Sequence, residues 1–242
     1  MFKNKEGFKV PEVSFKIMDG GKWKTVTTHD IFAGKKVVLF ALPGAFTPTC
    51  SSAHVPRYNA LFPIFQKHGI DTVVCLSVND TFIMNAWQKD QKAQNLMFLP
   101  DGNGEFSEKM GLLVDKSELG FGKRSWRYSM LVADGKIEKM FIEPNKPGDP
   151  FEVSDADTML HYIAPNVRTP QEVAIFTKPG CPHCARAKKL LKDKRVVFEE
   201  IVLGENTPMQ TLVAITGKQT VPQIFIAGKH IGGADELEKY FD

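Results

Sequence analysis

A short segment with few apolar residues separates two parts of the chain, each with its own complete pattern of strands and helices. The segment reads APNVRTPQ (164–171), and its two prolines are typical of a linker. With 242 residues, the chain is long enough for two domains that each bury a core. We therefore expect a first domain at residues 1–165, a linker at 166–170 and a second domain at 171–242.

The composition is typical of a globular protein and favours no nucleic-acid or membrane partner. Apolar residues make up 43% of the chain, and the formal charge is +3 with both signs interspersed. The first residues, MFKNKEGFKVPEVSF, contain no apolar signal segment, and no apolar run approaches the roughly 20 residues of a membrane span. Four cysteines without a secretion signal indicate a reducing cytoplasm, where a CxxC motif is catalytic or binds a metal.

The second part predicts the order β-α-β-α-β-β-α. The segments are the strand EVAIFTK, the helix CARAKKLLKDK, the strand VVFEEIVL, the helix TPMQTLVAITG, a hairpin around Ala227-Gly228 and the closing helix ADELEKYF. Pro208 is expected in the first turn of its helix. A helix between the first two strands predicts that they pair in parallel.

The first part also alternates strands and helices. We expect a buried strand at 36–41, a helix after Cys50 that Pro56 and Pro63 bend or interrupt, a buried strand at 70–78, an amphipathic helix at 81–93, and a hairpin around Asp134-Gly135. The expected fold class is therefore α/β, with a central sheet in each domain.

The sequence CPHC in the second part has the properties of a redox dithiol. Cys181 lies at the predicted start of a helix, where free N–H groups and the helix dipole favour a thiolate. Lys178, Arg186 and Lys188 add positive charge nearby. Cys184 lies one turn later on the same face, close enough for a disulfide with Cys181.

Zinc binding is the alternative for this pair of cysteines. A structural zinc site needs four ligands, and the chain has no second CxxC motif. His183 would point away from the two thiols on the helix. We therefore expect no metal site.

The second part resembles the glutaredoxins through three segments in the family's order and spacing. These are TKPGCPHC, TVPQIFI (220–226) and GGADEL (232–237), and the resemblance spans nearly all of 171–242. It implies a thioredoxin-like fold, attack by Cys181 on a mixed disulfide with glutathione, and a cis peptide bond at Pro222. The glutathione contacts that it implies are Lys178, Thr220, Val221, Pro222, Ala234 and Asp235. His183 departs from the family, in which a tyrosine is commoner.

Cys50 is the candidate reactive residue of the first part. It follows the proline-rich segment PGAFTPTC (43–50) and precedes a helical pattern, so the helix-terminus argument applies again. Thr47 lies three residues earlier and can turn its hydroxyl towards a thiolate. A buried structural cysteine is the alternative, and the residues alone leave both interpretations open.

The first part resembles the type-5 peroxiredoxins up to about residue 165. It carries their P-x-x-x-T-x-x-C pattern as Pro43, Thr47 and Cys50, within FALPGAFTPTCS. The resemblance implies that Cys50 attacks the peroxide, Thr47 orients its oxygens and Pro43 shields the site. It also implies a distant arginine, which is Arg127 here, with Arg124 as a less favoured substitute.

The same resemblance raises the question of how an oxidised Cys50 is reduced. Many relatives carry a second cysteine late in the domain, but the corresponding segment GDPFEVSDAD (148–157) has none. Cys75 lies in an apolar strand pattern and is expected in the core. His54, four residues after Cys50, is expected to lie on the helix surface or to pack against neighbours.

Taken together, the chain resembles bacterial fusions of a peroxiredoxin with a glutaredoxin, which implies two thioredoxin-like domains, each a central mixed sheet flanked by helices. The implied function is a peroxidase for hydrogen peroxide and organic hydroperoxides. Glutathione would be its reducing co-substrate, and no cofactor would be tightly bound. Two alternatives are a glutaredoxin-type reductase with a peroxide-sensing or docking first domain, and a non-enzymatic peroxide sensor. Type-5 relatives also imply a homo-oligomer.

Overall fold

The structure is a computed structural model with two compact units, residues 1–167 and 168–242. It describes residues 2–167, 169, 171–194, 196–205 and 207–241. The predicted linker at 166–170 includes Arg168 and Pro170, which lie outside the described residues. None of the described helices is long and apolar enough to cross a membrane.

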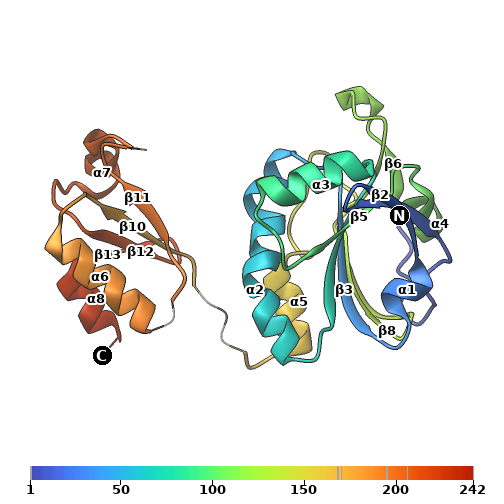
Figure 1. Cartoon of the computed structure of the whole chain (residues 1–242), viewed down its shortest axis with the longest axis horizontal. Helices are drawn as coiled ribbons and strands as arrows, with labels where there is room; N and C mark the ends of the chain where they lie inside the picture. The colour runs from blue at the N-terminus through green and yellow to red at the C-terminus, as the bar shows by residue number, and fades with distance from the viewer. Residues whose placement is uncertain (1, 168, 170, 195, 206, 242) are drawn as a thin grey trace. The chain divides into compact units, whose positions relative to one another are not determined.

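The first unit combines a central sheet with helices on both of its faces (Figure 1). Its strands are β1 (Ser14–Asp19), β2 (Lys22–Thr27), β3 (Lys36–Leu42), β4 (Thr72–Ser77), β5 (Met97–Pro100), β6 (Leu113–Asp115), β7 (Lys123–Ser125), β8 (Tyr128–Ala133) and β9 (Lys136–Ile142). Its helices are α1 (Thr28–Phe32), α2 (Val55–Lys67), α3 (Thr81–Asp90), α4 (Glu105–Met110) and α5 (Ala156–Ile163), with a π-helical turn η1 (Cys50–His54) and a 3-10 turn η2 (Ser117–Leu119).

The central sheet of the first unit has the order β5-β4-β3-β8-β9. Strand β3 is parallel to β4 and antiparallel to β8, so the sheet is mixed, as expected. Along β3, Phe40 faces a core shared with α2, α3 and α5, while Leu39 faces a second core shared with α1 and α4. Because both faces are covered, the strand is a continuous apolar run rather than an alternating one.

Strand pairing brings Arg127 close to the segment that carries Cys50. Tyr128, the first residue of β8, pairs with Ala41, the next-to-last residue of β3. Arg127 therefore lies where β3 ends and the Cys50 segment begins. The predicted hairpin at Asp134-Gly135 is confirmed, and both residues have positive φ angles, of 46° and 72°.

The helix after Cys50 differs from the prediction. Helix α2 continues through Pro63 without interruption, and Pro56 lies in its first turn, where a missing N–H group is tolerated. Before Pro56 the backbone forms the wider π turn Cys50–His54. Fully buried Tyr58, Leu61 and Phe65 pack into the core and stabilise the helix on both sides of Pro63.

Other element boundaries shift by a few residues, and several elements were not predicted, namely helices α1 and α4, the strand pair β6–β7 and the hairpin β1–β2. The helix expected at 81–93 ends at Asp90, and the helix expected to include Pro208 begins at Met209, with Pro208 as its N-cap. The hairpin β1–β2 has no counterpart in the sequence prediction. Only one of its twelve residues, Phe15, is buried, so its sequence lacks the alternation that marks a half-buried strand.

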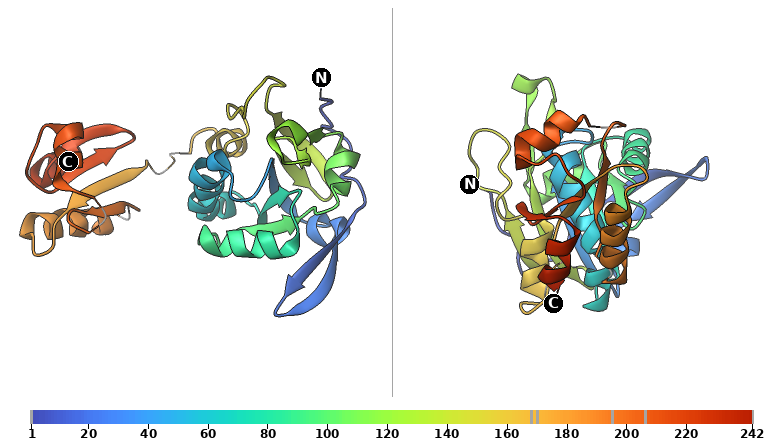
Figure 2. Two further views of the ribbon diagram at one scale, coloured as in Figure 1. Left: turned by 90° about the horizontal axis from the view of Figure 1, so that it is seen from above. Right: turned by 90° about the vertical axis from the view of Figure 1, so that its left-hand side faces the viewer.

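The second unit has the predicted order β-α-β-α-β-β-α (Figure 2). Its elements are β10 (Val173–Thr177), α6 (Pro182–Asp193), β11 (Glu199–Val202), α7 (Met209–Thr216), β12 (Gln223–Ile226), β13 (Lys229–Gly232) and α8 (Ala234–Phe241). The mixed sheet has the order β11-β10-β12-β13, and β10 and β11 are parallel as expected. Helices α6 and α8 cover one face, and α7 packs against the other.

Replacing Phe40 by alanine should destabilise the first unit by about 3–5 kcal/mol, because the cavity lies in a closed core. Phe40 is fully buried and stacks on Tyr58 with ring centroids 4.1 Å apart. Urea denaturation followed by tryptophan fluorescence measures this directly, since Trp23, Trp87 and Trp126 all belong to the first unit. The control Phe8→Ala, at a side chain that is 66% exposed, should change little. Equal losses from both variants would contradict the assignment of this core.

Candidate active sites

Cys50 lies at the start of the helical segment that continues into α2. It follows the loop after β3, and its side chain is fully buried. The N–H of Ser51 bonds to the Thr47 carbonyl at 3.0 Å, which closes the turn before the sulfur. Free N–H groups and the helix dipole at such a terminus stabilise a negative charge.

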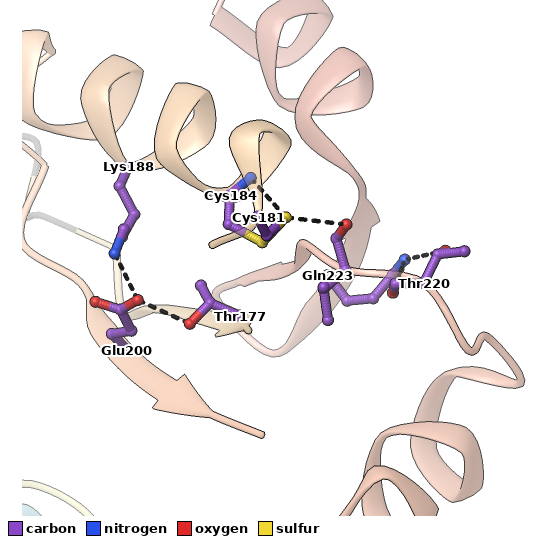
Figure 3. Close-up of a disulfide and its surroundings, with 8 residues drawn as sticks. Thr177, Cys181, Cys184, Lys188, Glu200, Thr220 and Gln223 are labelled. Atoms are coloured by element: carbon purple, nitrogen blue, oxygen red, sulfur yellow. Dashed lines mark hydrogen bonds and ion pairs between the residues drawn. A yellow bond between two sulfur atoms is a disulfide. The ribbon is translucent and has the colours of Figure 1, made fainter. Parts of the chain in front are cut away.

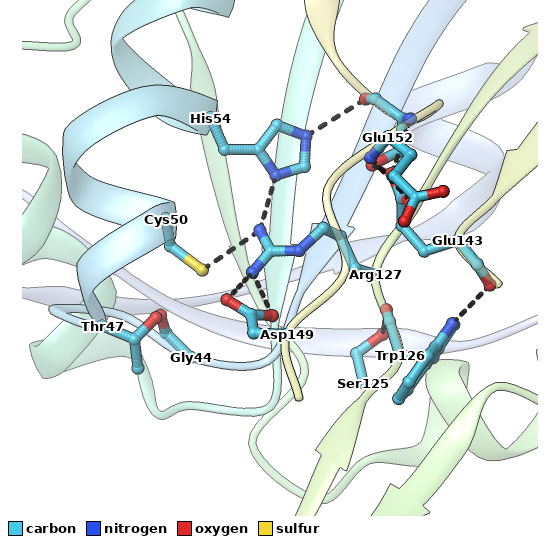
Figure 4. A network of polar contacts seen from close by, with 11 residues as sticks. Gly44, Thr47, Cys50, His54, Ser125, Trp126, Arg127, Glu143, Asp149 and Glu152 are labelled. Carbon is cyan, nitrogen blue, oxygen red and sulfur yellow. Dashed lines mark hydrogen bonds and ion pairs between the residues drawn. The ribbon is translucent and has the colours of Figure 1, made fainter. Parts of the chain in front are cut away.

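Arg127 contacts Cys50 directly (Figure 4). Its Nη1 donates to Sγ of Cys50 at 3.4 Å and to Nδ1 of His54 at 3.1 Å, while Nη2 donates to the carboxylate of Asp149. Burial by itself would lower the pKa of Arg127, but the negative charges of Cys50 and Asp149 outweigh burial and raise this pKa. The guanidinium therefore stays charged beside the sulfur. Arg124, the less favoured candidate, instead donates to the carbonyls of Val78 and Phe121.

His54 is a part of the site that the sequence analysis assigned to a surface or packing role. It is fully buried, and besides Arg127 it contacts the Ser154 carbonyl through Nε2 at 3.2 Å. Burial first, and the Arg127 charge second, lower its pKa to about 3, so the ring is neutral. Because arginine only donates, Nδ1 must accept and Nε2 must carry the hydrogen. The sequence did contain one signal for this role of His54: it lies four residues after Cys50, and this spacing places both residues on one face of a helix.

Pro43 and Thr47 line the same pocket as Arg127. The pocket has a volume of about 310 Å³. The Thr47 hydroxyl donates its hydrogen to the Gly44 carbonyl at 2.8 Å, so it can offer only lone pairs to an incoming group. No hydrogen bond between Thr47 and Cys50 occurs among the described contacts. The structure thus gathers Pro43, Thr47, Cys50 and Arg127 at one place, with the threonine hydroxyl turned towards the backbone.

In the second unit, Cys181 and Cys184 form a disulfide with a Cα–Cα distance of 5.3 Å (Figure 3). Cys181 is the N-cap of α6, and its sulfur accepts the N–H of Cys184 at 3.1 Å. Cys184 is buried, whereas Cys181 is partly exposed, so only the Cys181 sulfur can be reached by a substrate from solvent. The expected cis bond precedes Pro222, and the Val221 carbonyl lies 3.8 Å from Sγ of Cys181.

Most of the predicted glutathione contacts share one pocket beside the disulfide. This pocket, of about 480 Å³, is lined by Thr220, Val221, Pro222, Ala234 and Asp235. Lys178 lines a different pocket together with both cysteines. The structure therefore brings five of the six predicted residues together and places the sixth next to the dithiol.

Two of the three cations expected to act on Cys181 are engaged elsewhere. Arg186 pairs with Asp235 and Glu238, and Lys188 pairs with Glu200 at 2.7 Å. Their charges are therefore largely offset, and the helix terminus and Lys178 remain to stabilise a Cys181 thiolate. The sequence analysis missed these acidic partners because they lie 12 to 52 residues away along the chain.

Gln223 and His230 also belong to this site and were not predicted. The Gln223 amide donates to the Thr220 carbonyl at 2.9 Å and to its hydroxyl at 3.3 Å. The amide oxygen of Gln223 lies 2.6 Å from Nε2 of His230. These contacts fix the loop that presents Val221 to Cys181. The contacts with Thr220 are local, and the contact with His230 crosses the predicted hairpin, whose register is shifted between Ile224 and Phe225.

Two family models match the chain, Redoxin at residues 5–160 and Glutaredoxin at residues 173–231. The hybrid peroxiredoxin hyPrx5 of Haemophilus influenzae is 62% identical over 236 residues, which is 98% of each chain. The chain belongs to the hybrid peroxiredoxins. It therefore combines a peroxiredoxin with a glutaredoxin and is a peroxidase, and its fused glutaredoxin domain is consistent with glutathione dependence.

Solved structures support the fold of the first unit of this hybrid peroxiredoxin. Reduced Prx3 of Vibrio vulnificus in complex with hydrogen peroxide has a TM-score of 0.63 and 38% identity, covering 66% of this chain and 99% of that one. The antioxidant protein of Plasmodium falciparum, a 1-Cys peroxiredoxin, has a TM-score of 0.64 and 32% identity, covering 67% and 100%. Both units therefore have the expected thioredoxin-like fold, a mixed sheet flanked by helices.

The depressed pKa of His54 should make the first unit less stable in mild acid. Unfolding releases a histidine that binds a proton below its usual pKa of 6.5, whereas the folded state resists protonation down to about 3. Stability from this group is therefore complete above pH 6.5 and declines towards pH 3, by about 2 kcal/mol between pH 8 and pH 5. Urea denaturation at both pH values should show that His54→Gln removes this part of the loss. His161→Gln, at an exposed site, should not.

Replacing Gln223 by leucine should weaken glutathione recognition, because Thr220 loses both of its hydrogen bonds to the amide. We expect KM for a glutathione mixed disulfide to rise roughly fivefold, the effect of about one hydrogen bond. Steady-state reduction of that substrate measures the change. Gln210→Leu, on the exposed side of α7, is the matched control. An unchanged KM in Gln223→Leu would show that the amide does not support the site.

Proposed function

We propose that this hybrid peroxiredoxin reduces hydrogen peroxide and organic hydroperoxides at Cys50 and uses glutathione, through Cys181 and Cys184, to regenerate Cys50. The observation that carries the proposal is the contact between the buried guanidinium of Arg127 and Sγ of Cys50. A permanent positive charge at this distance favours the thiolate and the negative charge that develops on a peroxide oxygen. The pocket shared by Pro43, Thr47 and Arg127 is the route by which the peroxide arrives.

In the first step the Cys50 thiolate attacks the nearer oxygen of the hydroperoxide. The O–O bond breaks and an S–O bond forms. An organic hydroperoxide releases an alkoxide, which takes up a proton and becomes an alcohol, whereas hydrogen peroxide releases hydroxide, which becomes water. Cys50 is left as a sulfenic acid. Thr47 would orient the peroxide through its lone pairs, since its hydrogen is already donated to Gly44.

The first unit has no suitable thiol to resolve this sulfenic acid. Its other cysteine, Cys75, is fully buried in strand β4. Burial first, and the neighbouring Cys50 second, raise the pKa of the Cys75 thiol well above its usual value. A thiol held in its protonated form is a poor nucleophile. Glutathione would therefore condense with the sulfenic acid, release water and leave a Cys50–glutathione disulfide.

The second unit supplies the reduction. The Cys181 thiolate attacks the glutathione sulfur, frees Cys50 and becomes glutathionylated itself. In one route Cys184 displaces this glutathione and forms the Cys181–Cys184 disulfide, which two further glutathione molecules reduce to the dithiol, leaving as glutathione disulfide. In the other route a second glutathione attacks the Cys181–glutathione disulfide directly and leaves with the first as glutathione disulfide. Per cycle, one hydroperoxide and two glutathione molecules become one alcohol, one water and one glutathione disulfide. The partial exposure of Cys181 and the burial of Cys184 support this division of roles.

Glutathione would lie in the pocket beside the disulfide. The Val221 backbone before the cis bond to Pro222 would pair with its peptide, as in strand addition. Ala234 at the start of α8 would hold the γ-glutamyl end. Lys178 and Thr220 would lie near its glycine end. The Asp235 carboxylate is available to the substrate amine once it leaves Arg186.

Two further properties belong to the proposal. Exposed apolar side chains in the first unit, among them Phe46 and Leu119, support association into a homo-oligomer. Dependence on glutathione supports a reducing compartment such as the cytoplasm.

The decisive experiment is steady-state peroxide consumption by the intact chain, with glutathione, glutathione reductase and NADPH and without thioredoxin or added glutaredoxin. The wild-type protein should oxidise NADPH continuously. Cys50→Ser should fall to the background of the assay, because no nucleophile remains for the O–O bond. Cys181→Ser should consume one equivalent of peroxide and then nearly stop.

Activities that should be retained show that the variants are folded. Cys50→Ser should still reduce a glutathione mixed disulfide, since its dithiol is intact. Cys75→Ser should retain peroxide turnover, because Cys75 takes no part in the cycle. A single equivalent consumed by the wild-type chain would instead support a sensor, or a reductase with a docking domain. Turnover by Cys50→Ser would overturn the assignment of Cys50.

A further inference from the structure

Asp149 accepts hydrogen bonds from Nη2 of Arg127, the guanidinium nitrogen that does not contact Cys50 or His54 (Figure 4). Nη2 of Arg127 lies 2.5 and 2.6 Å from the two carboxylate oxygens of Asp149. The Arg127 side chain is 1% exposed, whereas that of Asp149 is 43% exposed. The carboxylate therefore lies between the buried guanidinium and the solvent. The catalytic steps proposed above make no use of it.

Asp149 also lines the pocket through which the hydroperoxide would reach Cys50. Within that lining, Arg127 contacts the Cys50 sulfur directly. The apolar part of its lining comes from Leu119, Phe121, Trp126 and Pro150. A hydroperoxide whose O–O group contacts Arg127 would place its remaining atoms against these apolar side chains. Asp149 is then close to any group that the substrate carries beyond its O–O bond.

The charges around the pocket are unfavourable for a substrate that carries a carboxylate. One guanidinium already faces the sulfur of Cys50 and the Asp149 carboxylate. Lys116 is the other cation of the lining, and its Nζ lies over the Trp126 ring, 5.0 Å from the centroid. A carboxylate on the substrate would meet the charge of Asp149 in a partly desolvated space, where like charges repel more strongly than in water.

We propose that Asp149 is a specificity-determining residue, which makes the peroxidase select uncharged hydroperoxides over negatively charged ones of the same shape. The proposal rests on the peroxidatic role of Cys50 proposed above. Because the Asp149 carboxylate is 43% exposed, an effective dielectric of about 40 applies, and two unit charges about 6 Å apart then repel enough to change a rate constant roughly tenfold. The substrates excluded are hydroperoxides with a carboxylate on the alkyl or aryl part.

The test compares cumene hydroperoxide with its para-carboxylate analogue, which share one carbon frame and differ in charge. The quantity measured is the ratio of kcat/KM for the neutral and the charged substrate. In the wild-type protein the neutral substrate should be favoured, and in Asp149→Asn the ratio should fall roughly tenfold. The ratio cancels any general effect of the substitution on Cys50. Asp149→Glu, which keeps the charge, should keep most of the preference.

Glu152→Gln is the matched control, because Glu152 lies on the same loop with a side chain 48% exposed and pairs with Lys146 instead of Arg127. Its ratio should equal that of the wild type. An unchanged ratio in Asp149→Asn, or an equal fall in Glu152→Gln, would overturn the role of Asp149. Failure of the wild-type protein to consume either substrate would overturn the proposed function itself, so the two failures are distinguishable.

Discussion

The contact between the buried guanidinium of Arg127 and the sulfur of Cys50 is the constraint on which the first unit depends. A buried charge costs several kcal/mol unless polar and charged partners surround it. Here the partners come from two separate segments: Cys50 and His54 from the start of a helix, and Asp149 from the loop after β9. The same loop is ordered by the buried carboxylate of Glu143, which accepts the N–H groups of residues 152–154 and leaves the Ser154 carbonyl facing His54. One cation thus ties together segments 100 residues apart.

The two units use a helix N-terminus in different ways. Cys50 is fully buried beside an arginine, whereas Cys181 is partly exposed at the N-cap of α6, with its nearby cations paired to acidic residues. A hydroperoxide is small and can enter a narrow pocket, where a low-dielectric environment strengthens the effect of Arg127. A glutathione mixed disulfide is bulky, so its attacking thiol must be reachable from solvent. The difference in burial between the two cysteines therefore fits the substrates proposed for them.

The burial of Cys75 explains why the two units belong to one chain. Its raised pKa keeps the thiol protonated, and strand β4 holds it in the core. In the proposed cycle, the first unit then has no reactive thiol of its own to reduce an oxidised Cys50. Joining the units would keep the reductase at an effective concentration of about a millimolar for a short tether.

The sequence by itself determined the division into two parts, the order of elements in the second part, the central strand at 36–41 and the two cysteine motifs, because all of these are local patterns. Arg127 was assigned only through the resemblance to the type-5 peroxiredoxins, and the pairing of β8 with β3 is what brings it close to Cys50. Only the tertiary structure decided that His54 is buried and neutral, that Asp149 covers Arg127, that Gln223 supports Thr220 and that Arg186 is neutralised by Asp235. Pro63 likewise fails to interrupt α2 because core packing on both sides outweighs a local helix-breaking tendency. For His54, Asp149, Arg186 and Pro63 the physical reason is the same: groups distant along the chain set the charge, burial or packing of the residue. The Gln223–Thr220 contact is local, but the side-chain direction that makes it is fixed only by the folded loop.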